Sequence, residues 1–327
     1  MHRNWGIIGA GVIAREMAQA LSSVHGEIHA IAGRTRANTE RLAAEYPIER
    51  VYDSVNELLT DPAVDVVYVA TPHNLHYDIM RQALLAGKHV LCEKAITVNA
   101  AQLSEIRSLA RERGLVVEEA MTLYHMPLYR ELQERIKQGV IGRVNLIQVN
   151  FGSCKPYDVN NRFFSPALAG GALLDIGVYA LSFARYFLDA LPDRIVTTAR
   201  FFETGVDEQS GIVMTNSQGQ MAVVSLSMRA KQPKRGVVSG ERGFIEVNDY
   251  PRADCAQIHL LSEREPQCLC VGETARALEY EVMDMERRLD GETRGFESFT
   301  DDVMALMTRI RQQWGMRYPF EAISDER

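Results

Sequence analysis

A segment near the N-terminus has the residue types and the spacing of a turn that binds phosphate groups. It consists of Gly9, Ala10, Gly11, Val12, Ile13 and Ala14. Glycine permits the tight turn at Gly9 and lets the backbone come close to a pyrophosphate at Gly11. The N–H groups at the start of the following helix attract such an anion. The segment therefore predicts a dinucleotide-binding site, with Gly9, Gly11, Val12, Ile13 and Ala14 beside the cofactor.

The residues after the second apolar strand, Ile28 to Ala32, indicate which dinucleotide binds. An NAD-specific site usually carries Asp or Glu here to hold the ribose 2′-hydroxyl. This chain has Gly33 followed by Arg34, Thr35 and Arg36, and guanidinium groups can pair with a 2′-phosphate and stack on adenine. We therefore expect NADP(H) as the preferred cofactor, with NAD(H) as the alternative. In the competing interpretation, Arg34 and Arg36 are only solvated surface charges.

Polar residues follow two further strands, where the reactive end of such a cofactor would lie. Thr71, Pro72, His73, Asn74 and His76 follow the apolar strand Val64 to Ala70, and Glu93 and Lys94 follow His89 to Cys92. Ligands of open α/β sheets bind at the carboxyl ends of the strands, so we expect these residues near the nicotinamide or the substrate. A loop histidine is often only a surface residue, whereas a cation at this place has few structural reasons to be there.

A third group of residues lies in the helical stretch Ala172 to Leu188, which follows a glycine pair. Asp175 and Tyr179 are four residues apart and would share one face of an α-helix. A phenol and a carboxylate on one face could move a proton. The competing interpretation is a structural aspartate near a helix start and a half-buried aromatic ring.

The surrounding elements predict a framework that brings these residues to strand ends. The first ~120 residues alternate apolar strands with amphipathic helices, as a parallel sheet with crossover helices requires. From Ile195 to Val271, repeated short strands with glycines between them predict a mostly antiparallel sheet. We expect an α/β protein with a Rossmann-type dinucleotide-binding domain over residues 1–122. Residues 123–327 would form an α+β domain for substrate binding and oligomerisation.

The composition is that of an ordinary soluble globular protein with room for two domains. Of 327 residues, 46% are hydrophobic and 24% charged. The formal net charge of −7 argues against a nucleic-acid partner. No apolar run approaches the ~20 residues of a membrane span. The N-terminal apolar run carries the glycine turn, so we interpret it as a first strand and not as a secretion signal.

The five cysteines are odd in number and lack a zinc-type spacing, so we expect no metal site. Cys268 and Cys270 are separated by one residue and should share a face of a strand. They could form a metal or redox pair, but two reduced structural thiols are the favoured interpretation. Reduced thiols fit a cytoplasmic location.

One strand of the predicted antiparallel sheet has a pronounced alternation. In Met221 to Met228, the apolar positions that should face the interior are Ala222, Val224, Leu226 and Met228. If helices of the same chain cover only that face, the other face is free to meet a second subunit. We therefore expect a homodimer, or a dimer of dimers, through this sheet.

Over nearly its whole length the sequence resembles the glucose–fructose oxidoreductase and inositol dehydrogenase (Gfo/Idh/MocA) family of two-domain NAD(P)-dependent enzymes. The resemblance rests on Gly9 to Ala14, Thr71-Pro72 with His76, Glu93-Lys94 and Asp175-Ile176-Gly177. Many members have histidine where this chain has Tyr179. The tyrosine is similar to the branch that holds dimeric dihydrodiol dehydrogenase and the NADP-dependent D-xylose 1-dehydrogenases.

This resemblance implies a dehydrogenase that transfers a hydride between nicotinamide and a hydroxyl or carbonyl of an aldose or a vicinal dihydrodiol. It implies Tyr179 as general acid/base, Lys94 as its electrostatic partner, Asp175 as an orienting carboxylate and Arg34 as the NADP-selecting residue. Tyr157 and Arg162, in the polar loop before the glycine pair, are candidates for substrate contacts. The alternative is a non-catalytic NAD(P)-binding regulatory protein.

The sequence departs from the family pattern at two places. Ala95 stands where the family usually has proline after Glu-Lys, which leaves the backbone that holds Lys94 freer. The stretch Thr122 to His125 lacks an arginine found in some relatives of the branch. The second departure bears on which substrate is used.

Overall fold

The computed structural model describes residues 3–25 and 28–321, which divide into two compact units. The first unit contains the residues up to Met126 together with Gly272–Thr300, and the second contains Pro127–Val271 and the residues from Asp301 onward. This division differs from the single boundary at residues 122–123 that the sequence suggested. Helix α9 (Ala277–Leu289) returns to the first unit because it packs against α1 (Val12–His25) and α6 (Thr122–His125).

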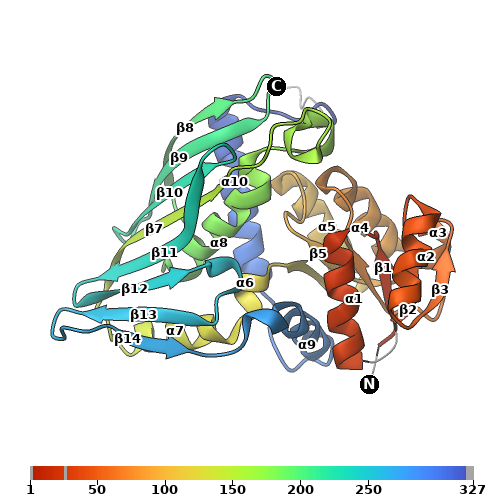
Figure 1. Ribbon diagram of the computed structural model, residues 1–327, viewed down its shortest axis with the longest axis horizontal. Helices are drawn as coiled ribbons and strands as arrows, with labels where there is room; N and C mark the ends of the chain where they lie inside the picture. The colour runs from red at the N-terminus through yellow and green to blue at the C-terminus, as the bar shows by residue number, and fades with distance from the viewer. Residues whose placement is uncertain (1–2, 26–27, 322–327) are drawn as a thin grey trace. The chain divides into compact units, whose positions relative to one another are not determined.

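The first unit is a parallel sheet with crossover helices, coloured red to yellow in Figure 1 except for α9, which is blue. Its elements are β1 (Trp5–Ile8), α1, β2 (Ile28–Ala32), α2 (Arg36–Glu45), β3 (Ile48–Tyr52), α3 (Val55–Thr60), β4 (Val66–Val69), α4 (His76–Leu85), β5 (His89–Glu93), α5 (Ala100–Arg113), β6 (Val117–Ala120), α6 and α9. The strand order is β3-β2-β1-β4-β5-β6, with every neighbouring pair parallel. The order reverses between β1 and β4, where sheets of this type hold their ligands. The predicted Rossmann-type sheet is confirmed.

The burial of each strand explains whether it could be predicted from the sequence. All residues of β1 and β4 are buried, as strands covered by helices on both faces must be. β3 lies at the edge of the sheet, is partly exposed, and was not predicted from the sequence. Glu49 and Arg50 interrupt its apolar residues, so no hydrophobic run marks it.

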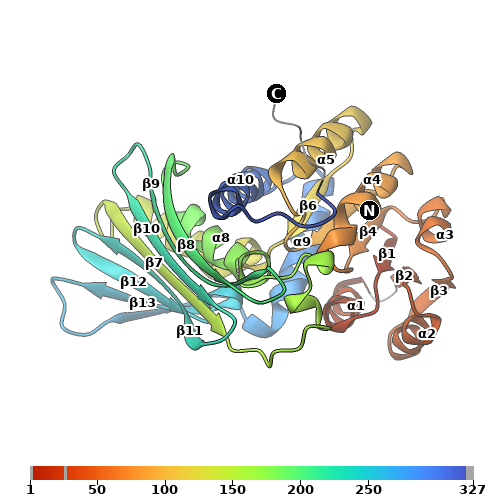
Figure 2. The same ribbon diagram turned by 90° about the horizontal axis from the view of Figure 1, so that it is seen from above.

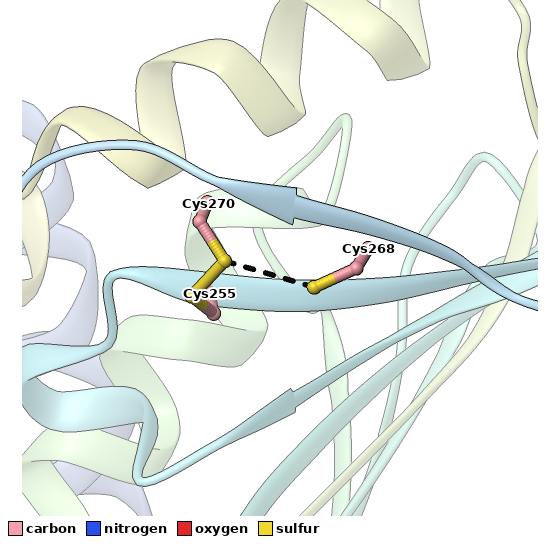
Figure 3. The surroundings of a disulfide bond; sticks show 3 residues. All are labelled: Cys255, Cys268 and Cys270. Carbon is pink, nitrogen blue, oxygen red and sulfur yellow. Dashed lines mark hydrogen bonds between the residues drawn. A yellow bond between two sulfur atoms is a disulfide. The ribbon is translucent and has the colours of Figure 1, made fainter.

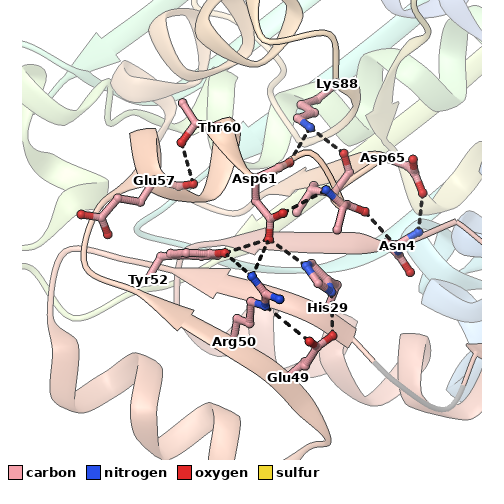
Figure 4. Close-up of polar contacts among 12 residues, drawn as sticks. Asn4, His29, Glu49, Arg50, Tyr52, Glu57, Thr60, Asp61, Asp65 and Lys88 are labelled. Carbon is pink, nitrogen blue, oxygen red and sulfur yellow. Dashed lines mark hydrogen bonds and ion pairs between the residues drawn. The ribbon is translucent and has the colours of Figure 1, made fainter.

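A buried polar network joins β2, β3 and the end of α3 (Figure 4). Asp61 accepts hydrogen bonds from the Tyr52 hydroxyl at 2.7 Å and the Ala63 backbone N–H at 2.9 Å, and His29 Nε2 lies 2.8 Å from its carboxylate. Lys88 Nζ donates to the Asp61 carbonyl at 2.7 Å. Burial opposes ionisation of Asp61, but the contacts from Ala63, Tyr52 and His29 outweigh it and hold its pKa well below the ordinary range. The network fixes this corner of the sheet.

The second unit contains an eight-stranded sheet in the order β14-β13-β12-β11-β7-β10-β9-β8. Its elements are α7 (Pro127–Lys137), β7 (Val144–Ser153), α8 (Val178–Phe187), β8 (Arg194–Phe201), β9 (Asp207–Thr215), β10 (Met221–Ser227), β11 (Lys231–Gly240), β12 (Gly243–Asn248), β13 (Cys255–Leu260), β14 (Gln267–Cys270) and, from Asp301 onward, α10 (Glu297–Trp314). Only β7 and β10 pair in parallel among the described strands of this sheet. The predicted mostly antiparallel sheet is confirmed.

Helices α8 and α10 lie against one face of this sheet, as Figures 1 and 2 show. The alternating side chains Ala222, Val224 and Leu226 of β10 are buried under them, so the prediction of an inward face is correct. In both views, no helix of the described chain covers the opposite face. That face carries exposed apolar side chains, with Val196 58% and Val213 37% exposed.

The second unit contains one apolar stretch that is longer than we expected from the sequence. Residues Pro166–Phe187 are long and apolar enough to cross a membrane by composition, which corrects the expectation that no run approaches that length. Of its most apolar window, 83% is buried inside the protein. Such burial is typical of a core helix, because a membrane span would expose this surface to lipid.

Candidate active site

The glycine-rich turn follows β1 and contacts the ends of the two neighbouring strands, β2 and β4. The Gly9 N–H donates to the Ala32 carbonyl of β2 at 2.8 Å. Gly9 has a φ of +121°, and a Cβ there would lie 2.5 Å from the Ala70 carbonyl oxygen after β4. A Cβ at Gly11 would meet no described atom within 4 Å, and Val12 is 79% exposed. Glycine is therefore required at Gly9, and the turn is open on the Gly11 side, as a pyrophosphate site needs.

The two arginines after β2 have different surroundings. Arg36, the first residue of α2, donates to Glu40 at 2.7 Å and to Asp53 at 2.6 Å. These hydrogen bonds, with the one to Glu40 the stronger influence, raise its pKa. Arg34 is exposed and forms no ion pair with the described residues. Of the two, Arg34 is the one whose guanidinium is available to a 2′-phosphate. Thr35 is the N-cap residue of α2 and forms no side-chain capping bond.

The histidines after β4 support the loop that carries Lys94. His73 Nε2 lies 3.0 Å from the Lys94 carbonyl oxygen, and His76 lies 3.0 Å from the Ala95 carbonyl and 2.8 Å from that of Thr71. Both rings are buried, and burial lowers the pKa of His76. The structure thus gives them a positioning role. The predicted contacts of Thr71, Pro72, His73, Asn74 and His76 with a cofactor stay predictions.

The loop after β5 is held from both sides while Lys94 itself is partly exposed. Glu93 accepts hydrogen bonds from the Tyr68 hydroxyl and, at 3.2 Å, from the Lys94 backbone N–H. The Ile96 N–H donates to Glu119 of β6 at 3.0 Å. The peptide bond between Lys94 and Ala95 is cis, and Ala95 is fully buried. The backbone under Lys94 is therefore anchored by β4, β5 and β6.

Glu119 is a site residue that the sequence analysis missed. It is 3% exposed, and its second oxygen accepts a hydrogen bond from the Thr300 hydroxyl at 3.1 Å. Burial raises its pKa to about 7, against the opposing hydrogen bonds from Ile96 and Thr300. No sequence signal marks it, because an acidic residue in a short strand is predicted to be exposed to solvent.

We expect the ionisation of Glu119 to lower the free energy of unfolding as the pH rises. Its pKa is about 7 in the folded chain and about 4.5 as an ordinary glutamate, so the protonated carboxyl favours the folded state. This contribution is complete below about pH 4.5 and is lost as the pH rises through 7. Between pH 4.5 and 8, the unfolding free energy of the natural chain should fall by about 3 kcal/mol more than that of Glu119→Gln.

Urea unfolding followed by circular dichroism at a series of pH values measures this difference. Glutamine can still accept the bond from Ile96, and the neighbouring buried Glu118 is present in both proteins. Glu112→Gln, on the exposed last turn of α5, is the matched control and should follow the natural chain. Equal pH slopes for the natural chain and Glu119→Gln would contradict the assignment.

In the second unit, Asp175 lies between two cations. It sits in a π-helical turn, Leu173–Gly177, that precedes α8. A regular α-helix was predicted over this region. The predicted α-helical register of Asp175 and Tyr179 is therefore wrong. Lys155 Nζ lies 3.9 Å and Arg162 Nη2 3.8 Å from the Asp175 carboxylate. Lys155 was missed, since it stands in a polar loop without a motif.

Two glycines, Gly171 before this turn and Gly177 at its end, lie in closely packed surroundings. Gly171 has a φ of +115°, and a Cβ there would lie 2.1 Å from Asp207 Oδ1. A Cβ at Gly177 would lie 2.7 Å from Leu226 Cδ1 of the sheet. Asp207 is buried and accepts a hydrogen bond from the Leu173 N–H at 2.7 Å. These contacts fix the start of the helical segment that carries Asp175.

Tyr179 is the second residue of α8 and is partly exposed, with its ring 6.4 Å from that of Phe151 on β7. Tyr157 is 37% exposed and stacks on Phe202 at 5.2 Å. Arg162 lies over the Phe163 ring at 4.2 Å, on the same loop. In the second unit, the side chains of Arg162 and Lys155 therefore lie close to the carboxylate of Asp175.

The candidate residues thus fall into two sets. The glycine turn, Arg34, the histidines, Glu93 and Lys94 belong to the first unit, and Asp175, Tyr179, Tyr157 and Arg162 to the second. The first set has the open, glycine-lined strand ends that suit a dinucleotide. The second set offers a phenol, a carboxylate and cations, which suit a polar substrate. Among the described residues, no group of three or more His, Cys, Asp or Glu is placed to hold a metal ion.

Comparison with known proteins places this chain among oxidoreductases. The family described as "Oxidoreductase family, NAD-binding Rossmann fold" matches residues 3–121, and the "GFO/IDH/MocA C-terminal domain" matches residues 129–246. Trans-1,2-dihydrobenzene-1,2-diol dehydrogenase of Xenopus tropicalis is 35% identical over 251 residues, which are 76% of each protein. The enzyme of the same name from Mus musculus is 34% identical over 253 residues, 76% of this chain and 75% of that protein.

Solved structures agree with these matches. A 3-ketoreductase from Actinomadura kijaniata, crystallised with NADP and TDP-benzene, has a TM-score of 0.86 and 28% sequence identity. The similarity covers 95% of this chain and 98% of the ketoreductase. An NAD-binding oxidoreductase from Klebsiella pneumoniae has a TM-score of 0.85 at 23% identity and covers 97% of each chain, which shows a shared fold.

Proposed function

The chain belongs to the GFO/IDH/MocA family of NAD-binding oxidoreductases and is an NAD(P)-dependent dehydrogenase; we propose that it is an NADP(H)-dependent enzyme acting on a sugar or a vicinal diol. The observation that carries this proposal is the presence of Lys94, Asp175 and Tyr179 together in a chain 35% identical to a dihydrodiol dehydrogenase. A regulatory protein without turnover, the alternative drawn from the sequence, could have lost these residues. We place the hydroxyl or carbonyl of the substrate beside Tyr179.

In the proposed mechanism, Tyr179 takes the proton of the substrate hydroxyl during oxidation and returns it during reduction. A phenol has a pKa near 10 and is a weak base at neutral pH. The ammonium group of Lys94 would favour the phenolate and so lower that pKa. Bound NADP+ supplies the hydride acceptor. Asp175, held near Lys155 and Arg162, would orient the polar substrate, with Tyr157 as a further contact.

The cofactor preference rests on Arg34. We expect Arg34→Ala to weaken NADP(H) binding at least about tenfold while NAD(H) binding changes little, because a charged hydrogen bond to the 2′-phosphate is worth roughly 1.5–3 kcal/mol. Fluorescence titration with each reduced cofactor measures both affinities. Arg41→Ala, an exposed arginine on α2, is the matched control. An unchanged ratio of the two affinities in Arg34→Ala would remove Arg34 from the site.

We also propose that the enzyme is a homodimer, assembled through the uncovered face of the eight-stranded sheet. The exposed apolar side chains of that face, among them Val196, Val213 and Met221, support this assignment, since a large apolar surface favours contact with another protein. Light scattering at micromolar concentration should give the mass of a dimer or a dimer of dimers. A monomer would contradict the proposal.

Absorbance of NADPH, followed across a panel of aldoses, dihydrodiols, the corresponding carbonyl compounds and alcohols of other classes, tests the substrate class. Turnover with at least one sugar or vicinal diol supports the proposal. Turnover confined to substrates of other classes would contradict the substrate assignment, and no turnover with the whole panel would contradict it as well.

A further inference from the structure

Three cysteines meet at the exposed edge of the eight-stranded sheet. Cys255 of β13 and Cys270 of β14 form a disulfide, and the free thiol of Cys268 lies with its Sγ 3.6 Å from that of Cys270 (Figure 3). All three residues are exposed. The sequence analysis favoured two reduced structural thiols at Cys268 and Cys270, and the disulfide corrects that interpretation.

The strand register explains the arrangement. Cys255 and Cys270 are directly opposite each other in the antiparallel pair of β13 and β14, while Cys268 lies opposite Gln257. Because Cys268 and Cys270 are two residues apart on a strand, their side chains point to the same face. The thiol is therefore placed beside the disulfide by the backbone itself.

We propose that these cysteines form a thiol–disulfide exchange site. The thiolate of Cys268 attacks the Cys270 sulfur, a Cys268–Cys270 bond forms, and the Cys255–Cys270 bond breaks. The electron pair leaves on Cys255, which takes up the proton that Cys268 released to water. One disulfide is lost and one is formed, so the step needs no oxidant or reductant.

The edge position of β14 makes this exchange feasible. In an extended strand, residues two apart have their Cα atoms about 6.6 Å from each other and their Cβ bonds nearly parallel, so a bond between Cys268 and Cys270 requires β14 to bend at Leu269. β14 has four residues and pairs only with β13 in the described sheet, so it can adjust with little loss of pairing. Cys268 and Cys255, which carry the attacking and the leaving sulfur, are both exposed.

The exchange has a consequence for the path of the chain. Before exchange, the Cys255–Cys270 disulfide ties β14 to β13, and the chain passes from the second unit to the first directly after Val271. After exchange, β14 keeps only its backbone pairing with β13. The exchange therefore changes how firmly the segment that enters the first unit is fixed to the sheet, without a change in the number of disulfides.

Peptide mapping tests the proposal on the full-length protein. Trypsin cuts after Arg252, Arg264 and Arg276, so Cys255 falls in one peptide and Cys268 with Cys270 in the next. The oxidised protein is held at pH 8 without reductant, its free thiols are blocked with N-ethylmaleimide, and it is denatured and digested. We expect two species: the cross-linked peptide pair, and blocked Cys255 together with an internal Cys268–Cys270 disulfide.

Variants at Cys268 make the result decisive. In Cys268→Ser and in Cys268→Ala, the amount of blocked Cys255 should fall at least tenfold, and only the cross-linked pair should remain. Cys154→Ser, which removes another exposed free thiol, should behave like the natural chain. Absence of the Cys255–Cys270 cross-link, or equal blocking of Cys255 with and without Cys268, would overturn the proposal.

Discussion

Replacing Tyr179 by phenylalanine should lower kcat by about 10²- to 10⁴-fold, the usual contribution of a positioned proton-transfer group. The substitution removes one hydroxyl and leaves the ring that packs near Phe151, so the fold should be preserved. NADP+ affinity should change little, because the cofactor-binding turn belongs to the other unit. Steady-state kinetics and a cofactor titration on the same preparation separate the two effects.

The control for this experiment is Tyr77→Phe. Tyr77 donates to Glu105 on the surface between α4 and α5 at 2.6 Å, so this variant loses one bonded hydroxyl outside the candidate site and should keep full turnover. Turnover of Tyr179→Phe within about threefold of the natural enzyme would exclude Tyr179 as the general acid/base, since the expected loss is at least about 10²-fold.

Lys94→Ala should also lower kcat by about 10²-fold or more, and it should change the pH profile. Without the ammonium group, the phenol of Tyr179 regains a higher pKa, so the rise of kcat/KM with pH in the oxidation direction should move to higher pH. Each unit of that displacement corresponds to about 1.4 kcal/mol of lost phenolate stabilisation. The rate profile between pH 6 and 11 measures both changes.

A matched control is available in Lys137→Ala, which removes an exposed lysine that pairs with Glu134 on α7. Its profile should match that of the natural enzyme. If Lys94→Ala lowered kcat without moving the profile, Lys94 would act by binding and not through the pKa of Tyr179. If neither quantity changed, Lys94 would have no part in the reaction.

Much of the fold follows from the sequence because its strands are apolar and its turns carry glycine. The runs at Trp5, Ile28 and Val64 gave three neighbouring strands of the parallel sheet, and the alternation in Met221 to Met228 gave the inward face of β10. Edge strands gave weaker signals, since β3 and β14 are partly exposed and carry polar residues. The return of α9 to the first unit depends on packing that no local pattern encodes.

The candidate site was only partly predictable, for physical reasons. Gly9 and Gly11 are marked by backbone geometry, and Lys94 by its place after a strand. The roles of His73 and His76 as supports of the Lys94 loop depend on contacts across some twenty residues of sequence. Glu119 and Lys155 carry no motif, and the disulfide depends on a strand register that brings Cys255 opposite Cys270.

A crystal structure with NADP+ and a substrate analogue tests the central proposal most directly. We expect the 2′-phosphate beside Arg34, and one hydroxyl of the analogue within hydrogen-bond distance of Tyr179 while lying next to the nicotinamide C4, with Lys94 in reach of the same group. An analogue bound far from Tyr179 and Lys94, or a nicotinamide turned away from both, would contradict the proposed mechanism.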